Sequence, residues 1–148
     1  MSLRAEIHKK LGAFSLDISL ETQGGVLGLL GASGCGKSMT LKCIAGIEKP
    51  DSGYIALDGT VLFDSKRGIN LAPQQRKVGY LFQNYALFPH MTVRQNILCG
   101  LKWEKRREIR EQKYRDVLEL LQLEQLQQHR PHQLSGGQAQ RTALARMP

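Results

Sequence analysis

The sequence has no long run of apolar residues and only three cysteines. No segment approaches the roughly 18 apolar residues of a membrane-spanning helix, and residues 1–10 lack the apolar core of a secretory signal. Cys35, Cys43 and Cys99 are too few, and odd in number, for a disulfide framework, which favours a reducing compartment. We therefore expect a cytoplasmic chain that meets a membrane only through a partner.

The chain of 148 residues is long enough for one domain with a real core, and 41% of its residues are apolar. Its net charge of +8 would suit nucleic acid, anionic lipid or a nucleotide, and charge alone does not choose among them. The most basic stretch, residues 102–115, mixes both signs of charge, which is typical of a solvated helix face. We therefore expect no nucleic-acid partner.

The most informative stretch is Gly31–Ser38, which matches the phosphate-binding loop pattern Gly-x-x-x-x-Gly-Lys-Ser. The apolar run 26–30 before it predicts a short buried strand. Residues 39–45 after it predict a helix that ends at Gly46. A strand, a glycine loop and a helix in this order form the context that the motif requires. The alternative is a glycine-rich turn without a ligand.

Each residue type in the loop suits phosphate chemistry. The glycines let the backbone turn successive N–H groups inward, and the following helix start adds the positive end of its dipole. Lys37 supplies a point charge for the phosphates and Ser38 a hydroxyl for Mg²⁺. We interpret Cys35 as a small loop residue, and a thiol whose alkylation blocks nucleotide binding is the alternative. The predicted nucleotide-binding residues are Gly31, Ser33, Gly34, Cys35, Gly36, Lys37, Ser38 and Met39.

The rest of the chain predicts a mixed α/β part, residues 1–88, followed by a helical part, residues 89–148. The expected strands are 14–20, a hairpin of 54–57 with 61–63, and 77–82, which ends at Gln83. The expected helices are 93–101 with Thr92 as N-cap, much of 102–128, and 138–146.

Leu134-Ser135-Gly136-Gly137-Gln138, together with the helix after it, resembles the signature motif of ATP-binding-cassette (ABC) ATPases. Gln83 resembles the lone glutamine that follows a strand in that family. Residues 85–93 look like the importer version of the same region. Three motifs in the right order make the resemblance cover nearly the whole chain.

The resemblance implies a P-loop NTPase core with an antiparallel β portion and a helical subdomain, and it implies ATP and Mg²⁺ as ligands. Gln83 would be catalytic, contacting Mg²⁺ or the attacking water, and Ser38 would share the metal. Residues Leu134, Ser135, Gly136, Gly137 and Gln138 would grip the γ-phosphate of ATP held by a second ATP-binding subunit, in a head-to-tail dimer. Membrane permease subunits would hold the protein on the inner face of the membrane.

Two positions depart from the family pattern. Leu11 stands where the family has an adenine-stacking aromatic, which leaves Phe14 and His8 as nearby rings. Phe14 is interpreted as a packing residue, with base stacking as the alternative. Met39 replaces a common Thr but keeps its backbone N–H for phosphate.

No strand follows the signature, so the Walker B Asp, the catalytic Glu and the switch His of the family are absent. We therefore expect an incomplete core, a fragment with impaired hydrolysis. The leading interpretation is the ATP-binding subunit of an importer, most similar to the molybdate/sulfate type. The alternatives are a non-catalytic ATP-binding fragment and a soluble ABC ATPase acting on nucleic acid.

Overall fold

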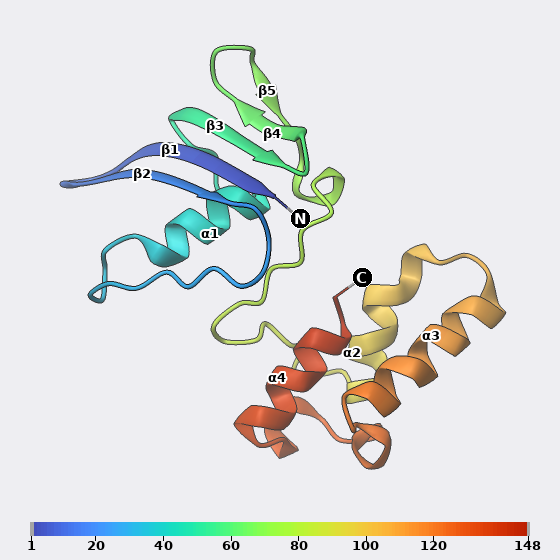
Figure 1. The fold of residues 1–148 in the computed structure, drawn as a ribbon. Coiled ribbons are helices and arrows are strands. Elements are labelled where there is room, and N and C mark those ends of the chain that lie inside the picture. The colour runs from blue at the N-terminus through green and yellow to red at the C-terminus, as the bar shows by residue number, and fades with distance from the viewer. Residues whose placement is uncertain (1, 148) are drawn as a thin grey trace. The chain divides into compact units, whose positions relative to one another are not determined.

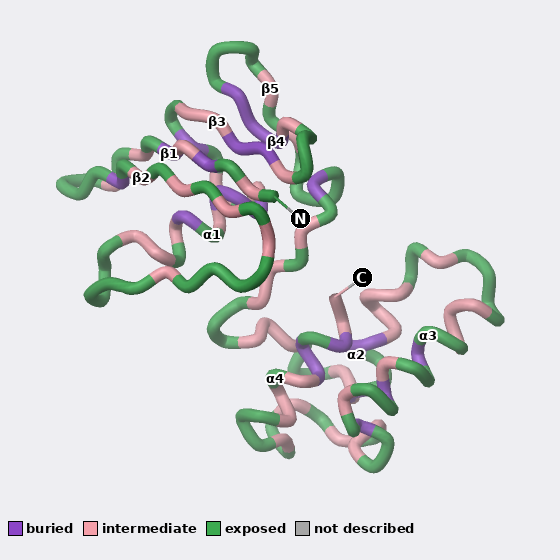
Figure 2. Tube along the Cα trace, viewed as in Figure 1, coloured by how far each residue is buried: buried purple, intermediate pink, exposed green. Residues whose placement is uncertain are grey.

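A computed structural model describes residues 2–147, which form two compact units with the boundary between Tyr80 and Leu81 (Figure 1). The first unit contains a sheet and one helix, and the second contains helices and short turns. Each unit has its own buried apolar cluster, shown by the purple segments of Figure 2. The architecture is thus mixed α/β, as the sequence predicts.

The sheet of the first unit has five strands in the order β2-β1-β3-β4-β5, and every neighbouring pair is antiparallel. A tight turn at Gly12 joins the first two strands, and Asp58-Gly59 closes the predicted hairpin. The strands are β1 (Leu3–Leu11), β2 (Phe14–Thr22), β3 (Ser52–Leu57), β4 (Thr60–Asp64) and β5 (Ile69–Asn70).

Helix α1 (Lys37–Ala45) packs its buried side chains against this sheet. Cys43 and Ile44 of the helix share one buried cluster with Ala5 and Ile7 of β1 and Ile55 of β3. Gly46 ends the helix in a left-handed conformation, as predicted. Burial raises the pKa of the Cys43 thiol, so this side chain behaves as a small neutral core residue.

Two predicted strands, 26–30 and 77–82, do not form. Both runs lie outside the five strands that the structure describes, and Val26 and Leu30 remain 101% and 97% exposed. A buried strand exists only when neighbours take up its N–H and C=O groups. The apolar composition of the two runs therefore indicates a tendency to be buried. It does not show that a neighbouring strand is available to pair with them.

The second unit contains α2 (Val93–Gly100), α3 (Arg107–Leu120) and α4 (Gly136–Ala145). Thr92 caps α2 as predicted, and its hydroxyl accepts from the Gln95 N–H while the Gln95 side chain accepts from the Thr92 N–H. The buried Asn96 of α2 fixes the preceding loop, because its amide donates to the carbonyls of Phe88, Met91 and Thr92.

The helix predicted over much of 102–128 is shorter than expected. It ends at Leu120 because Gln122 takes a left-handed conformation with φ 52°. The Gln122 N–H then donates to the Glu119 carbonyl, and the Leu123 N–H donates to the Leu118 carbonyl. This pair of bonds satisfies the last turn of the helix. A glutamine at this position gives no sequence signal for such an end.

Candidate phosphate-binding site

The loop before α1 has the backbone that its glycines predict. Gly36 caps the helix with φ 95°, a conformation that L side chains rarely adopt. A Cβ at this position would lie 2.6 Å from Leu16 Cδ1, a buried atom of β2. The left-handed conformation and the packed Leu16 side chain therefore both favour glycine at position 36.

The amino end of α1 suits an anion. No side chain caps it, and its first turn carries no acidic residue. The N–H groups of its first turn have no acceptor within the helix, and the helix dipole adds partial positive charge there. Lys37 and Ser38 of this turn, together with the glycine loop, are the donor set that a phosphate group fits.

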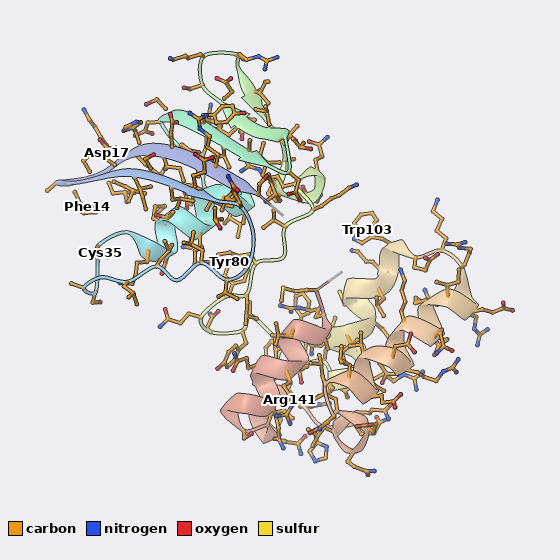
Figure 3. The ribbon with its side chains drawn as sticks, viewed as in Figure 1. Phe14, Asp17, Cys35, Tyr80, Trp103 and Arg141 are labelled. Carbon is orange, nitrogen blue, oxygen red and sulfur yellow. The ribbon has the colours of Figure 1, made fainter. Side chains whose placement is uncertain are left out.

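The Lys37 ammonium lies over the loop. It donates to the carbonyls of Gly31 at 2.6 Å and Ala32 at 2.7 Å, and it lies 3.4 Å from the sulfur of Cys35. The positive charge of Lys37 therefore lies in the same short segment as the first-turn N–H groups of α1, which have no acceptor within the helix. Cys35 is exposed (Figure 3), and the alkylation hypothesis for its thiol remains a prediction.

The carboxyl end of α1 is fixed by a buried arginine that the sequence analysis missed. Arg76 is 2% exposed and donates to the carbonyls of Cys43, Ile44 and Leu71. A Cβ on Gly46 would lie 2.5 Å from Arg76 Nε, so the close approach requires glycine there. Burial lowers the pKa of the guanidinium, which lies against carbonyls rather than a carboxylate. Its positive charge complements the negative end of the helix dipole.

Gln83 is exposed and begins the turn 83–86, near the start of the second unit. The phosphate loop belongs to the first unit, and Gln83 belongs to the second. The catalytic role of Gln83 therefore remains a prediction.

Ser135 begins α4, as the signature pattern predicts. Its hydroxyl accepts from the Gln138 N–H at 3.3 Å, and the Gln138 side chain accepts from the Ser135 N–H at 2.8 Å. Leu134 packs against the apolar cluster of the second unit. A Cβ on Gly136 or Gly137 would meet nothing within 4 Å, so these glycines leave open space at the helix start.

Phe14, labelled in Figure 3, lies at the first position of β2, and the residue is 41% exposed. A Cβ on Gly36 would lie 3.5 Å from the ring, so the ring is beside the phosphate loop. The nearby His8 is paired with Asp17 at 3.1 Å. Neither observation assigns a base-stacking residue, and both alternatives for Phe14 stay open.

Within residues 2–147, no group of three or more His, Cys, Asp or Glu side chains could hold a metal ion. No helix in the same residues has the length and apolarity to cross a bilayer.

Comparison with known proteins identifies a family. The family described as ABC transporter matches residues 14–148. The molybdenum import ATP-binding protein ModC of Paramagnetospirillum magneticum is 44% identical over 144 residues, which is 97% of this chain and 39% of that protein. A probable sulfate/thiosulfate import ATP-binding protein, CysA of Chlorella vulgaris, is 46% identical, and the match covers 99% of this chain and 61% of that protein.

The trehalose/maltose import ATP-binding protein MalK of Thermococcus litoralis is 47% identical over 133 residues. The match covers 88% of this chain and 36% of that protein. The chain thus spans about two fifths of the molybdenum-import relatives and less than two thirds of the others. Among solved structures, a dimeric bacterial ABC transporter cassette is similar with a TM-score of 0.70 at 28% identity, covering 99% of this chain and 68% of that one. A dimeric cassette bound to ADP and Pi gives 0.76 at 29% identity, with the same coverage.

Proposed function

Because the chain belongs to the ABC transporter family, we propose that it is the ATP-binding part of a subunit that couples ATP hydrolysis to solute import. The observation that carries this proposal is the loop before α1. Its glycine backbone, its uncapped helix start and the Lys37 ammonium together form a cradle for the phosphates of a nucleotide. The dimeric cassette bound to ADP and Pi is similar in fold and supports the choice of ligand.

Within this proposal, Lys37 exchanges its two carbonyl acceptors for phosphate oxygens when the nucleotide binds. The N–H groups of Gly34, Gly36 and Met39 add neutral donors around the same oxygens. Ser38 and Gln83 would hold Mg²⁺, which neutralises phosphate charge during hydrolysis. Gln83 would also orient the attacking water.

The signature helix acts on a second nucleotide. Ser135 already uses its hydroxyl as a cap acceptor, while its O–H proton stays available as a donor. The open space over Gly136 and Gly137 lets another subunit bring a phosphate close to the helix start. We therefore propose a head-to-tail dimer, and the dimeric state of the similar cassette supports it.

The solute we propose is an oxyanion of the molybdate or sulfate type. The molybdenum and sulfate import proteins among the relatives support it. The trehalose/maltose import protein is about as similar, at 47% identity, so sequence similarity at this level extends to proteins that import other solutes. Membrane permease subunits would carry the solute and hold this chain at the inner face of the membrane.

A second candidate function is ATP binding without turnover by this 148-residue chain. Asp58 and Asp64 belong to the hairpin region of the sheet, and Asp64 accepts from the N–H groups of Lys66 and Arg67. Neither is a candidate to polarise water at the loop. We therefore expect nucleotide binding with little hydrolysis, and steady-state turnover at an ordinary family rate would contradict this.

The test is a calorimetric titration of the chain with Mg·ATP. Loss of one charge-assisted contact costs about 1.5–3 kcal/mol, so Lys37→Ala should weaken binding by roughly 10- to 150-fold. Lys66→Ala is the matched control, because it removes the same charge from an exposed position of the same unit. Equal dissociation constants for the two variants would refute the proposal.

A further inference from the structure

The turn that follows Gln83 contains two strained residues in succession. Tyr85 has φ 59° and Ala86 has φ 47°, a left-handed conformation that residues other than glycine rarely adopt. Such residues persist only where the surrounding structure holds them, and they occur preferentially at switch regions and active sites. Something in the second unit must therefore hold this turn.

The N–H groups of Tyr85 and Ala86 donate to the local carbonyls of Phe82 and Asn84, and the side chain that holds the carbonyls of the turn is the guanidinium of Arg146. Its Nη1 donates to the Ala86 carbonyl at 2.7 Å, and its Nη2 donates to the Tyr85 carbonyl at 3.2 Å. The same guanidinium lies 5.2 Å from the centre of the Phe88 ring. One side chain thus bonds the carbonyls of both strained residues and covers the ring that follows them. A planar fork with two parallel N–H donors is specific to arginine.

Arg146 is itself held by the helices on which it lies. It ends α4, and its N–H donates to the Thr142 carbonyl at 3.2 Å. Its own carbonyl lies so near Gly100 that a Cβ there would collide with it, so the end of α2 packs directly on this residue. The position of the guanidinium is therefore set by α2 and α4, and any movement of α4 along its axis moves the turn.

We propose that Arg146 is a positioning residue that fixes the turn after Gln83 to the helix that begins at Ser135. The inference rests on the proposed function, in which Gln83 serves the nucleotide of its own subunit and Ser135 serves the nucleotide of the partner. Helix α4 has 10 residues and connects the two positions as one rigid rod about 15 Å long. Through Arg146, a change of nucleotide at the Gln83 site would alter the conformation at the Ser135 site.

The first test measures the strain and needs no nucleotide. Trp103 is the one tryptophan of the sequence and lies in the second unit, so its fluorescence follows thermal unfolding of that unit. Ala86→Gly relieves the strained conformation but gives the unfolded chain more freedom, so it should raise Tm by a net few °C, up to about 6 °C, in the parent protein. In an Arg146→Met background the turn is already released, and the same change should raise Tm by less than about 1 °C.

Gln122→Gly is the matched control. Gln122 is also left-handed, with φ 52°, but it lies at the end of α3, where its N–H donates to the Glu119 carbonyl. Its Tm gain should be the same in the parent and in the Arg146→Met background, within about 1 °C. Arg146→Lys, which can reach one carbonyl but not both, should give an intermediate gain for Ala86→Gly. Equal gains for Ala86→Gly in all three backgrounds would overturn the proposal.

The second test measures coupling, at a protein concentration where sedimentation shows a monomer. Mg·ATP should change hydrogen exchange at the amides of Gly136 and Gly137 in the parent protein and not in Arg146→Met. The two proteins should bind Mg·ATP with dissociation constants that agree within about threefold. The same exchange response in both proteins would overturn the coupling. Failure of the parent to bind Mg·ATP would refute the proposed function, while the Tm comparison would still decide whether Arg146 holds the turn.

Discussion

The sharpest stability prediction concerns Gly36, where α1 begins. Replacing it with alanine places a methyl group in a left-handed residue with φ 95°, at a point 2.6 Å from Leu16 Cδ1. Gly34 and Gly28 form a graded pair of controls. Gly34 has φ 83° with no atom within 4 Å of a built Cβ, and Gly28 has neither a left-handed φ nor a close neighbour.

The magnitudes follow from these three environments. A left-handed alanine costs about 1–2 kcal/mol, and overpacking against a buried atom costs about 1–3 kcal/mol. Alanine also restricts the unfolded chain more than glycine does, which stabilises the folded protein by about 0.4–1 kcal/mol. Gly36→Ala should therefore destabilise the first unit by about 1–5 kcal/mol. Gly34→Ala should cost about 0–1.5 kcal/mol, and Gly28→Ala should stabilise by up to about 1 kcal/mol.

Differential scanning calorimetry measures this series, because it records the unfolding of the sheet-containing unit without a fluorescent reporter. For a domain of this size each kcal/mol corresponds to about 4–8 °C in Tm, so Gly36→Ala should lower Tm by at least about 4 °C. The order of Tm, from highest to lowest, should be Gly28→Ala, then Gly34→Ala, then Gly36→Ala. A Gly36→Ala protein as stable as Gly28→Ala would show that the loop backbone is not held as the structure describes.

Two further predictions concern buried side chains. Arg76→Met leaves three carbonyls without their donor and should destabilise the first unit by about 2–4 kcal/mol, whereas Arg67→Met, at an exposed position, should change urea unfolding little. Burial raises the pKa of Tyr114, so its contribution to stability is complete below about pH 10 and is lost as pH rises through the raised pKa. Urea unfolding of Tyr114→Phe should therefore show a smaller alkaline loss of stability than the parent, and an identical loss would contradict this.

The sequence predicts the features that depend on neighbours in the chain. The loop before α1, the helix end at Gly46, and the caps Thr92 and Ser135 all form as expected, because their hydrogen bonds join residues at most a few positions apart. The Asp58-Gly59 hairpin is predicted for the same reason.

Features that depend on distant partners are not predicted. The runs 26–30 and 77–82 have strand composition, yet a strand requires a pairing segment that composition does not supply. Arg76 bonds a carbonyl 33 residues away, and Arg146 bonds one 60 residues away. No local pattern marks either arginine, because each acts on backbone carbonyls that any residue could provide.

The central claim is that the loop before α1 binds the phosphates of ATP. The most direct measurement is an amide shift map of the ¹⁵N-labelled chain during titration with Mg·ATP. The account predicts that the largest shifts fall on residues 31–39 and that Lys37→Ala removes them, while Lys66→Ala keeps them. Saturable binding whose largest shifts lie outside that segment, or no binding at all, would contradict the account.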